Sequence, residues 1–260
     1  MESYQTIKTS TDGAVLTLCL ARPAVHNALN DIMIREMSAL FNHLEQDEGI
    51  RVVVIRGEGK SFCSGADLRW MQNAFSLSPE ENLRECCELS DLFGIIFNSS
   101  KIVVAAIHGH VFGGGTGLAA VCDLAYCTAD SQFSLSEARL GMTAASITPY
   151  LLKKMSASDL KELIFTAKHF GGTEAVRYGL VHQHFPSMQE LEINLKQTTS
   201  RLLSNGRQAI TESKKLINRL TGSGKTPEME EIPSLLARIR VSAEAREGFS
   251  AFLEKRKPNW

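Results

Sequence analysis

Two glycine-rich turns and one glutamate are the residues of this chain whose types and spacing could do chemistry. The first turn spans residues 62–68 (Phe-Cys-Ser-Gly-Ala-Asp-Leu), and the second spans residues 108–117 (His-Gly-His-Val-Phe-Gly-Gly-Gly-Thr-Gly). Each follows an apolar run typical of a buried strand and precedes a predicted helix, so each offers unpaired backbone N–H groups at a helix N-terminus. Two such turns aimed at one point would form an oxyanion hole. Glu137 follows both turns and is the candidate acid–base group.

Two nucleotide-binding motifs are excluded by single residues. Residues 59–61 (Gly-Lys-Ser) match the end of a phosphate-binding P-loop, but that motif needs a glycine where Val54 stands. The run 113–117 does not complete a dinucleotide-binding G-x-G-x-x-G, because residue 118 is leucine. Glycines alone also fit tight packing of a helix on a strand. The presence of a second turn of the same kind favours a site over packing.

Composition describes a globular chain with no electrostatic preference for polyanions. The 260 residues are 43% hydrophobic and 22% charged, with a formal net charge of -1, which argues against a nucleic-acid binder and against broad attraction to membranes. No apolar run is long enough to span a bilayer, and the N-terminus lacks a secretory signal pattern, so we expect a cytoplasmic protein. The six cysteines form no CxxC pair or zinc-type cluster, which predicts reduced thiols and no metal site.

The elements that must position these residues alternate along the first half of the chain. Strands are predicted over 4–9, 14–20, 51–56, 102–107 and 123–128, and helices after Asn30, over 79–98 and over 118–122. Asp12-Gly13 is a hairpin signal, and Asn30 is a plausible N-cap. This recurrence predicts an α/β fold of repeated β/α units.

Helices dominate from residue 146 onward. Ser158 and Thr173 are candidate N-caps, and amphipathic spacing predicts further helices over 188–204, 207–220 and 228–254. Several apolar residues in the last segment exceed what one core can cover, and we expect them to contact another subunit. They are Ile232, Leu235, Leu236, Ile239 and Phe249.

The order of several motifs resembles the enoyl-CoA hydratase/isomerase (crotonase) superfamily over essentially the whole chain. The motifs are Arg22-Pro23…Asn27-Ala28-Leu29, the turn 62–68, Gly113-Gly114-Gly115…Cys122-Asp123, Gln132-Phe133…Glu137…Leu140-Gly141 and the ending 247–256. The resemblance implies a crotonase-type spiral of β-β-α units over residues 1–195 with the acyl-CoA site. It also implies a helical region over 196–260 for assembly into a homotrimer or a dimer of trimers.

Carried over position by position, the resemblance also implies roles for individual residues. The N–H groups of Ala66 and Gly114 would hold the thioester oxygen, and Glu137 matches one of the two glutamates of typical hydratases. Other matched positions would bind CoA, which arrives as part of the substrate and not as a separate cofactor. They are Arg22, Ala24, Val25, Ser64, Gly65, Asp67, Leu68, Gly113, and, reaching a neighbouring subunit, Phe252 and Lys255.

One departure from the family pattern concerns the reaction itself. The position of the second hydratase glutamate is Gly117, so the expected pair of carboxylates is absent. The surrounding stretches are most similar to bacterial methylglutaconyl-CoA and carboxygeranoyl-CoA hydratase-like proteins of leucine and acyclic-terpene breakdown. This similarity implies hydration of a branched 2-enoyl-CoA by a single glutamate.

Other readings of the same residues stay open at this point. One carboxylate moving a proton between C4 and C2 would make an enoyl-CoA isomerase, and loss of the second glutamate also fits a catalytically weak acyl-CoA-binding protein; a decarboxylase is a weaker possibility. His108 and His110 could hold water or a substrate carboxylate, although partly buried structural histidines are more common. Cys63 is expected to pack, and Asp67 is expected to fix its turn by accepting backbone N–H bonds.

Overall fold

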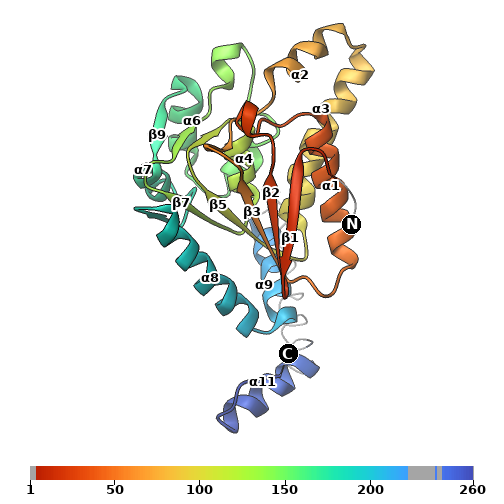
Figure 1. The fold of residues 1–260 in the computed structure, drawn as a ribbon, viewed down its shortest axis with the longest axis vertical. Helices are drawn as coiled ribbons and strands as arrows, with labels where there is room; N and C mark the ends of the chain where they lie inside the picture. The colour runs from red at the N-terminus through yellow and green to blue at the C-terminus, as the bar shows by residue number, and fades with distance from the viewer. Residues whose placement is uncertain (1–3, 222–237, 239–241, 260) are drawn as a thin grey trace. The chain divides into compact units, whose positions relative to one another are not determined.

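The computed structural model describes residues 4–221, 238 and 242–259, and it divides into two compact units, residues 1–197 and 198–260 (Figure 1). The first unit holds all the strands of the described chain, in two sheets. They are β1 (Ile7–Asp12), β2 (Val15–Leu20), β3 (Val52–Gly57), β4 (Ser61–Cys63), β5 (Ile102–Ile107), β6 (His110–Phe112), β7 (Leu124–Thr128), β8 (Gln132–Ser134), β9 (His169–Gly171) and β10 (Gln183–Phe185).

The larger sheet has six strands in the order β1-β2-β3-β5-β7-β10. The β1–β2 pair is an antiparallel hairpin that turns at Gly13, where φ is +55°, and every later pairing in this sheet is parallel. Strands β3 and β5 are buried along nearly their whole length, which explains their uninterrupted runs of valine, isoleucine and alanine.

The smaller sheet has the order β4-β6-β8-β9, in which β4, β6 and β8 run parallel and β9 is antiparallel. Each of its parallel strands follows one strand of the larger sheet after a short connection and precedes a helix. The chain therefore repeats as β3-β4-helix, β5-β6-helix and β7-β8-helix, which confirms the expected α/β fold of β-β-α units.

The helices and 3-10 turns (η) of the first unit cover these sheets or connect their strands. They are η1 (Pro23–Val25), α1 (Asp31–Gln46), α2 (Leu68–Asn73), η2 (Ala74–Ser76), α3 (Pro79–Asn98), α4 (Gly114–Val121), η3 (Glu137–Leu140), α5 (Thr148–Leu151), α6 (Ala157–Thr166), α7 (Gly172–Arg177) and most of α8 (Met188–Ser204). Helices α1 and α3 lie side by side next to β1 and β2 (Figure 1) and contribute buried residues such as Phe41 and Phe93 to one core.

Local sequence signals set most of the helix starts. The Asn30 side chain accepts a hydrogen bond from the Met33 N–H at the start of α1, as expected, and Ser78 and Glu81 form a capping box on α3. Two predicted caps are wrong. Ser156 rather than Ser158 caps α6, and α7 begins after Gly171 rather than Thr173, because the Glu174 carboxylate accepts the N–H of Gly171.

The second unit contains the C-terminal end of α8, α9 (Arg207–Leu220) and α11 (Ala243–Leu253). Within it, the Glu244 carboxylate accepts the N–H groups of Gln208 and Ala209 at the start of α9. The predicted subunit-contact residues Ile232, Leu235, Leu236 and Ile239 lie outside the described residues, whereas Phe249 lies on α11.

Candidate active site

The order of strands in the small sheet brings the three candidate catalytic segments to one edge. Because β4, β6 and β8 are parallel neighbours, the turns that leave their C-terminal ends lie side by side. Those turns carry Ala66, Gly114 and Glu137 respectively. Segments separated by many residues in the sequence therefore meet at one place, which is the edge of a parallel sheet where ligands commonly bind.

The first turn is held by an unusual number of polar contacts. The loop 22–29 pairs with it, since the Leu29 N–H donates to Gly65 O and the Asp67 N–H donates to Leu29 O, both at 2.8 Å. As expected, the Asp67 carboxylate caps α2 by accepting the N–H groups of Arg69 and Trp70, and it also binds the Arg22 guanidinium at 2.8 Å. Burial raises the pKa of Asp67, but these hydrogen bonds outweigh burial, so its pKa lies below the usual value.

The second turn depends on a backbone conformation that glycine adopts readily. Gly113 has φ +47° and ψ −117°, and its N–H donates to Ser134 O at 2.9 Å, which ties the turn to β8. The buried Thr116 hydroxyl donates to Val111 O at 2.8 Å and fixes the first turn of α4 against β6. Helix α4 therefore begins at Gly114 with its N-terminus at the sheet edge.

The backbone N–H groups of Ala66 and Gly114 come close together and have no hydrogen-bond partner among the described residues. The two turns nearly touch, since a Cβ built on Gly65 would lie 3.6 Å from the Gly114 nitrogen and 2.9 Å from Phe112 O. A Cβ built on Gly114 would in turn lie 4.0 Å from the Ala66 nitrogen. Two unpaired backbone donors that lie near each other could together stabilise a developing oxyanion.

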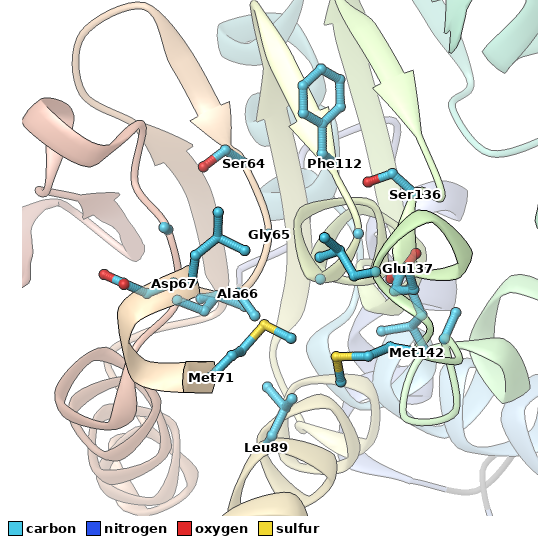
Figure 2. A pocket seen from close by; sticks show the side chains of 18 of the residues that line it. Ser64, Gly65, Ala66, Asp67, Met71, Leu89, Phe112, Ser136, Glu137 and Met142 are labelled. Atoms are coloured by element: carbon cyan, nitrogen blue, oxygen red, sulfur yellow. The ribbon is translucent and has the colours of Figure 1, made fainter. Parts of the chain in front are cut away.

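Glu137 faces these donors from η3, across the pocket from Ala66 (Figure 2). Its Oε1 would lie 3.1 Å from a Cβ built on Gly113, so the carboxylate sits against the second turn. Its Oε2 is buried and has no hydrogen-bond partner among the described residues. Burial is the main influence on this carboxyl and raises the pKa of Glu137 above its ordinary value.

Gly117, one helical turn after Gly114, has no room for a side chain. A Cβ built there would lie 2.2 Å from Ile147 Cγ2 and 3.2 Å from Phe93 Cε1. The volume in which a second carboxylate would stand is therefore filled by hydrocarbon. Position 117 therefore supplies no second carboxylate, by packing as well as by sequence.

A cavity of about 790 Å³ opens beside these groups, within the first unit. In Figure 2, Gly65, Ala66 and Asp67 lie on one side and Ser136, Glu137 and Met142 on the other, with Met71 and Leu89 between them. Beyond the predicted residues, its walls are formed largely by apolar side chains. They include Leu29, Met71, Leu89, Phe93, Phe112, Leu140, Met142 and Ile147.

Most of the predicted site residues line this cavity. They are Arg22, Val25, Ser64, Gly65, Ala66, Asp67, Leu68, Gly113, Gly114 and Glu137. Ala24 is exposed on η1 and is not a lining residue, and Arg22 is already bound to Asp67 and to Ala28 O. Lys255 belongs to the second unit, and the side chain of Phe252 lies outside the described residues, so their CoA contacts stay predictions.

The apolar residues of the cavity walls were hard to predict from the sequence. Phe93 and Leu89 belong to the long amphipathic helix α3, where a pocket-facing residue has the same spacing as a core residue. Met142 and Ile147 lie in the segment between η3 and α5, which has no regular periodicity.

His108, His110 and Cys63 belong to the two turn segments but do not line the cavity. The His108 Nε2 lies 3.0 Å from Gly59 O, and the His110 ring stacks on Phe112 at a centroid distance of 5.1 Å. Cys63 is fully buried, and burial raises the pKa of its thiol to about 12, so it packs as expected and is no nucleophile.

Among the described residues, no cluster of histidine, cysteine or carboxylate side chains could hold a metal ion, and no helix is long and apolar enough to cross a membrane.

Fold and site together define an α/β protein in which two helix-opening turns and one half-buried carboxylate meet at a largely apolar cavity. Comparison with protein families assigns it more closely: residues 10–260 match the model of the family described as enoyl-CoA hydratase/isomerase. The chain therefore belongs to the enoyl-CoA hydratase/isomerase family, within the crotonase superfamily.

Individual relatives agree with this membership and differ in reaction. The chain is 31% identical to a putative enoyl-CoA hydratase of Thermus thermophilus, over 95% of the chain and 98% of that protein. It is 30% identical to the peroxisomal Delta(3,5)-Delta(2,4)-dienoyl-CoA isomerase of Arabidopsis thaliana, over 100% of the chain and 98% of that protein. The crystal structure of an enoyl-CoA hydratase from Shewanella pealeana matches with a TM-score of 0.93 at 31% identity, covering 98% of this chain and 96% of that one.

Proposed function

We propose that this protein hydrates a 2-enoyl-CoA thioester, with Glu137 as its only acid–base side chain. The observation that carries the proposal is the Glu137 carboxylate, which lies against the second turn with a buried, unpaired Oε2 and faces two unpaired N–H donors. In this proposal the thioester carbonyl oxygen accepts hydrogen bonds from Ala66 and Gly114. Each donor of this kind contributes about 3–4 kcal/mol to stabilising an enolate.

The proposed steps are the addition of water to C3 and proton transfers through Glu137, and they need neither metal nor redox cofactor. Glu137 accepts a proton from water as the water oxygen bonds to C3, and the electrons of the double bond move into the enolate held at the two N–H groups. The protonated Glu137 then returns the proton to C2, which leaves the hydroxyacyl-CoA and regenerates the carboxylate. Burial raises the pKa of Glu137 toward neutral pH. A carboxyl whose pKa lies nearer the working pH is efficient both at accepting and at returning a proton.

We further propose that the acyl chain is branched, as in methylglutaconyl-CoA. Support comes from the similarity of the sequence around Gly117 and Glu137 to branched-chain hydratase-like proteins, and from the cavity wall. Met71 and Met142 lie on the cavity wall (Figure 2), and the flexible thioether side chain adapts to irregular apolar shapes.

Double-bond isomerisation is the second candidate, and the packing over Gly117 favours it. A proton shuttle between C4 and C2 needs one carboxylate and no attacking water, and the hydrocarbon of Ile147 and Phe93 offers no second polar group to orient water. The peroxisomal relative named as a dienoyl-CoA isomerase supports the same alternative.

The test is mass spectrometry of the products from crotonyl-CoA, 3-methylglutaconyl-CoA and a 3-enoyl-CoA, with the wild type beside Glu137→Gln. Gain of one water by a 2-enoyl-CoA, lost in the variant, supports the hydratase. A shifted double bond at unchanged mass contradicts hydration and supports the isomerase. Acyl-CoA binding without turnover of any of the three contradicts both enzymatic proposals and supports an acyl-CoA-binding protein.

A further inference from the structure

Among the residues that line the cavity, Ile147 packs most tightly against a glycine of α4, and that glycine is Gly117. A Cβ at Gly117 would lie 2.2 Å from Ile147 Cγ2 and 2.9 Å from Ile147 Cβ, separations that folded proteins do not tolerate. The two residues are thus complementary. Gly117 has no side chain, and the Ile147 side chain fills the volume that a side chain at position 117 would need.

Ile147 is held firmly in that position. It is buried with 3% of its surface exposed, its N–H donates to Ala144 O, and its carbonyl accepts the N–H groups of Tyr150 and Leu151 at the start of α5. A buried β-branched side chain on a hydrogen-bonded backbone has little freedom to move aside.

Ile147 also lies close to where the reaction would occur. Both Ile147 and Phe93 line the cavity. The Phe93 ring would contact a Cβ built on Gly117 (3.2 Å) and one built on Gly114 (3.9 Å). The hydrocarbon wall therefore runs along α4 from the Gly114 donor to Gly117, next to the carbons that follow a thioester carbonyl bound at that donor.

We propose that Ile147 is the specificity-determining residue of this site, and that it sets the largest substituent accepted at the reacting carbons of the acyl chain by filling the space over Gly117. The inference rests on the proposed acyl-CoA function and refines it by assigning the size limit to one side chain. Removing the Ile147 side chain opens that space next to the bound thioester while leaving Glu137 and the two donors in place.

The experiment measures selectivity by calorimetric titration with butanoyl-CoA and 3-ethylpentanoyl-CoA, for the wild type and Ile147→Ala. Binding of saturated thioesters needs no turnover, so failure of the hydration proposal leaves this measurement intact. We expect the ratio of the two dissociation constants to move toward the bulkier ligand by about 10-fold or more in Ile147→Ala, since one methylene in a pocket changes discrimination by about 10- to 200-fold.

Ile34→Ala is the matched control, because Ile34 is equally buried, lies on α1 and does not line the cavity. It should leave the ratio unchanged. A folded Ile147→Ala protein with the wild-type ratio would overturn the proposal. If the wild type binds neither ligand, the substrate class itself is wrong and the proposal falls with it.

A second measurement tests the complementarity without any ligand. Gly117→Ala should lower the melting temperature in the wild-type background and lower it much less in an Ile147→Gly background, because the clashing atoms are gone. Ile34→Gly serves as the additive comparison. An equal drop in all three backgrounds would show that Ile147 is not what excludes a side chain at position 117, and would contradict the proposal.

Discussion

At the scale of single residues, the proposed chemistry requires Glu137 to be both accessible to substrate and poorly solvated. Its Oε2 is buried without a partner, and burial raises its pKa. An unpaired buried polar group lowers the stability of the folded protein. Its presence therefore points to a role in function rather than in stability.

The first prediction concerns activity. Glu137→Gln keeps the shape of the side chain but cannot accept a proton, so kcat should fall by about 10²- to 10⁴-fold, the usual contribution of general acid–base catalysis. In the wild type, kcat/KM should rise with pH through the raised pKa of Glu137 as the carboxylate forms. Steady-state rates from pH 4 to 9 check both, with the exposed Glu80→Gln as control; wild-type rates in Glu137→Gln would reject the role.

The second prediction concerns stability. Because the folded-state pKa of Glu137 is raised, its protonated form is favoured in the folded protein, and stability is lost as pH rises through that value. Glu137→Gln removes this loss, so its melting temperature should exceed that of the wild type at pH 7. The difference should shrink at pH 4, below the raised pKa. Scanning calorimetry at both pH values decides it, and a lower melting temperature for the variant at pH 7 would contradict the burial argument.

At the scale of elements, the two turns are built to different designs. Polar side chains lock the first one, through Asp67 and Arg22, whereas backbone conformation at Gly113 makes the second. Both turns end with a free N–H at the same sheet edge, but only the second places its glycine against the Glu137 carboxylate.

The third prediction follows from that contact. Gly113→Ala forces a side chain into a left-handed conformation, at a cost of about 1–3 kcal/mol, and its Cβ lies 3.1 Å from Glu137 Oε1. The variant should therefore lose both stability, measured by urea unfolding, and kcat. Gly13→Ala is the matched control, because Gly13 has φ +55° in the β1–β2 hairpin with no atom within 4 Å of its Cβ. It should lose stability alone; an equal loss of kcat in the control would contradict the local explanation.

Elements were more predictable than the contacts between them. The apolar run 102–107 and the N-cap Asn30 depend only on residues nearby in the sequence. Local composition and periodicity were therefore sufficient to predict the strand and the start of the helix. The motifs also indicated that the turns around Ala66 and Gly114 belong to one site. The packing of Ile147 against Gly117 joins residues 30 positions apart in chain segments of different kinds, and no local pattern encodes it. Cap identity failed at Ser158 because Ser156, two residues earlier, is also a good cap.

At the scale of the whole molecule, several large apolar side chains of the first unit remain uncovered. Leu68, Phe75 and Leu83, on and around α2, η2 and α3, are 65%, 90% and 64% exposed. Exposed apolar side chains that gather on one face mark binding grooves and subunit interfaces, and these three residues are candidates for such a face.

The fourth prediction is the assembly state. The family resemblance and this exposed surface lead us to expect three or six copies of the 28.6 kDa chain in solution. Light scattering after size-exclusion chromatography at micromolar concentration gives the mass directly. Phe75→Ser should reduce assembly if this surface is the interface, with Ser76→Ala as a neutral neighbour. A single-chain mass for the wild type would contradict the expectation.

The strand order β3-β5-β7-β10 also has a consequence for synthesis in the cell. Each parallel strand joins the growing sheet only after its predecessor has been made, so the newest strand is an open edge until the next one leaves the ribosome. The longest stretch of chain between two neighbouring parallel strands separates β7, which ends at Thr128, from β10, which begins at Gln183. The nascent chain thus already holds Ala66, Gly114 and Glu137 while β7 still has no β10 to pair with.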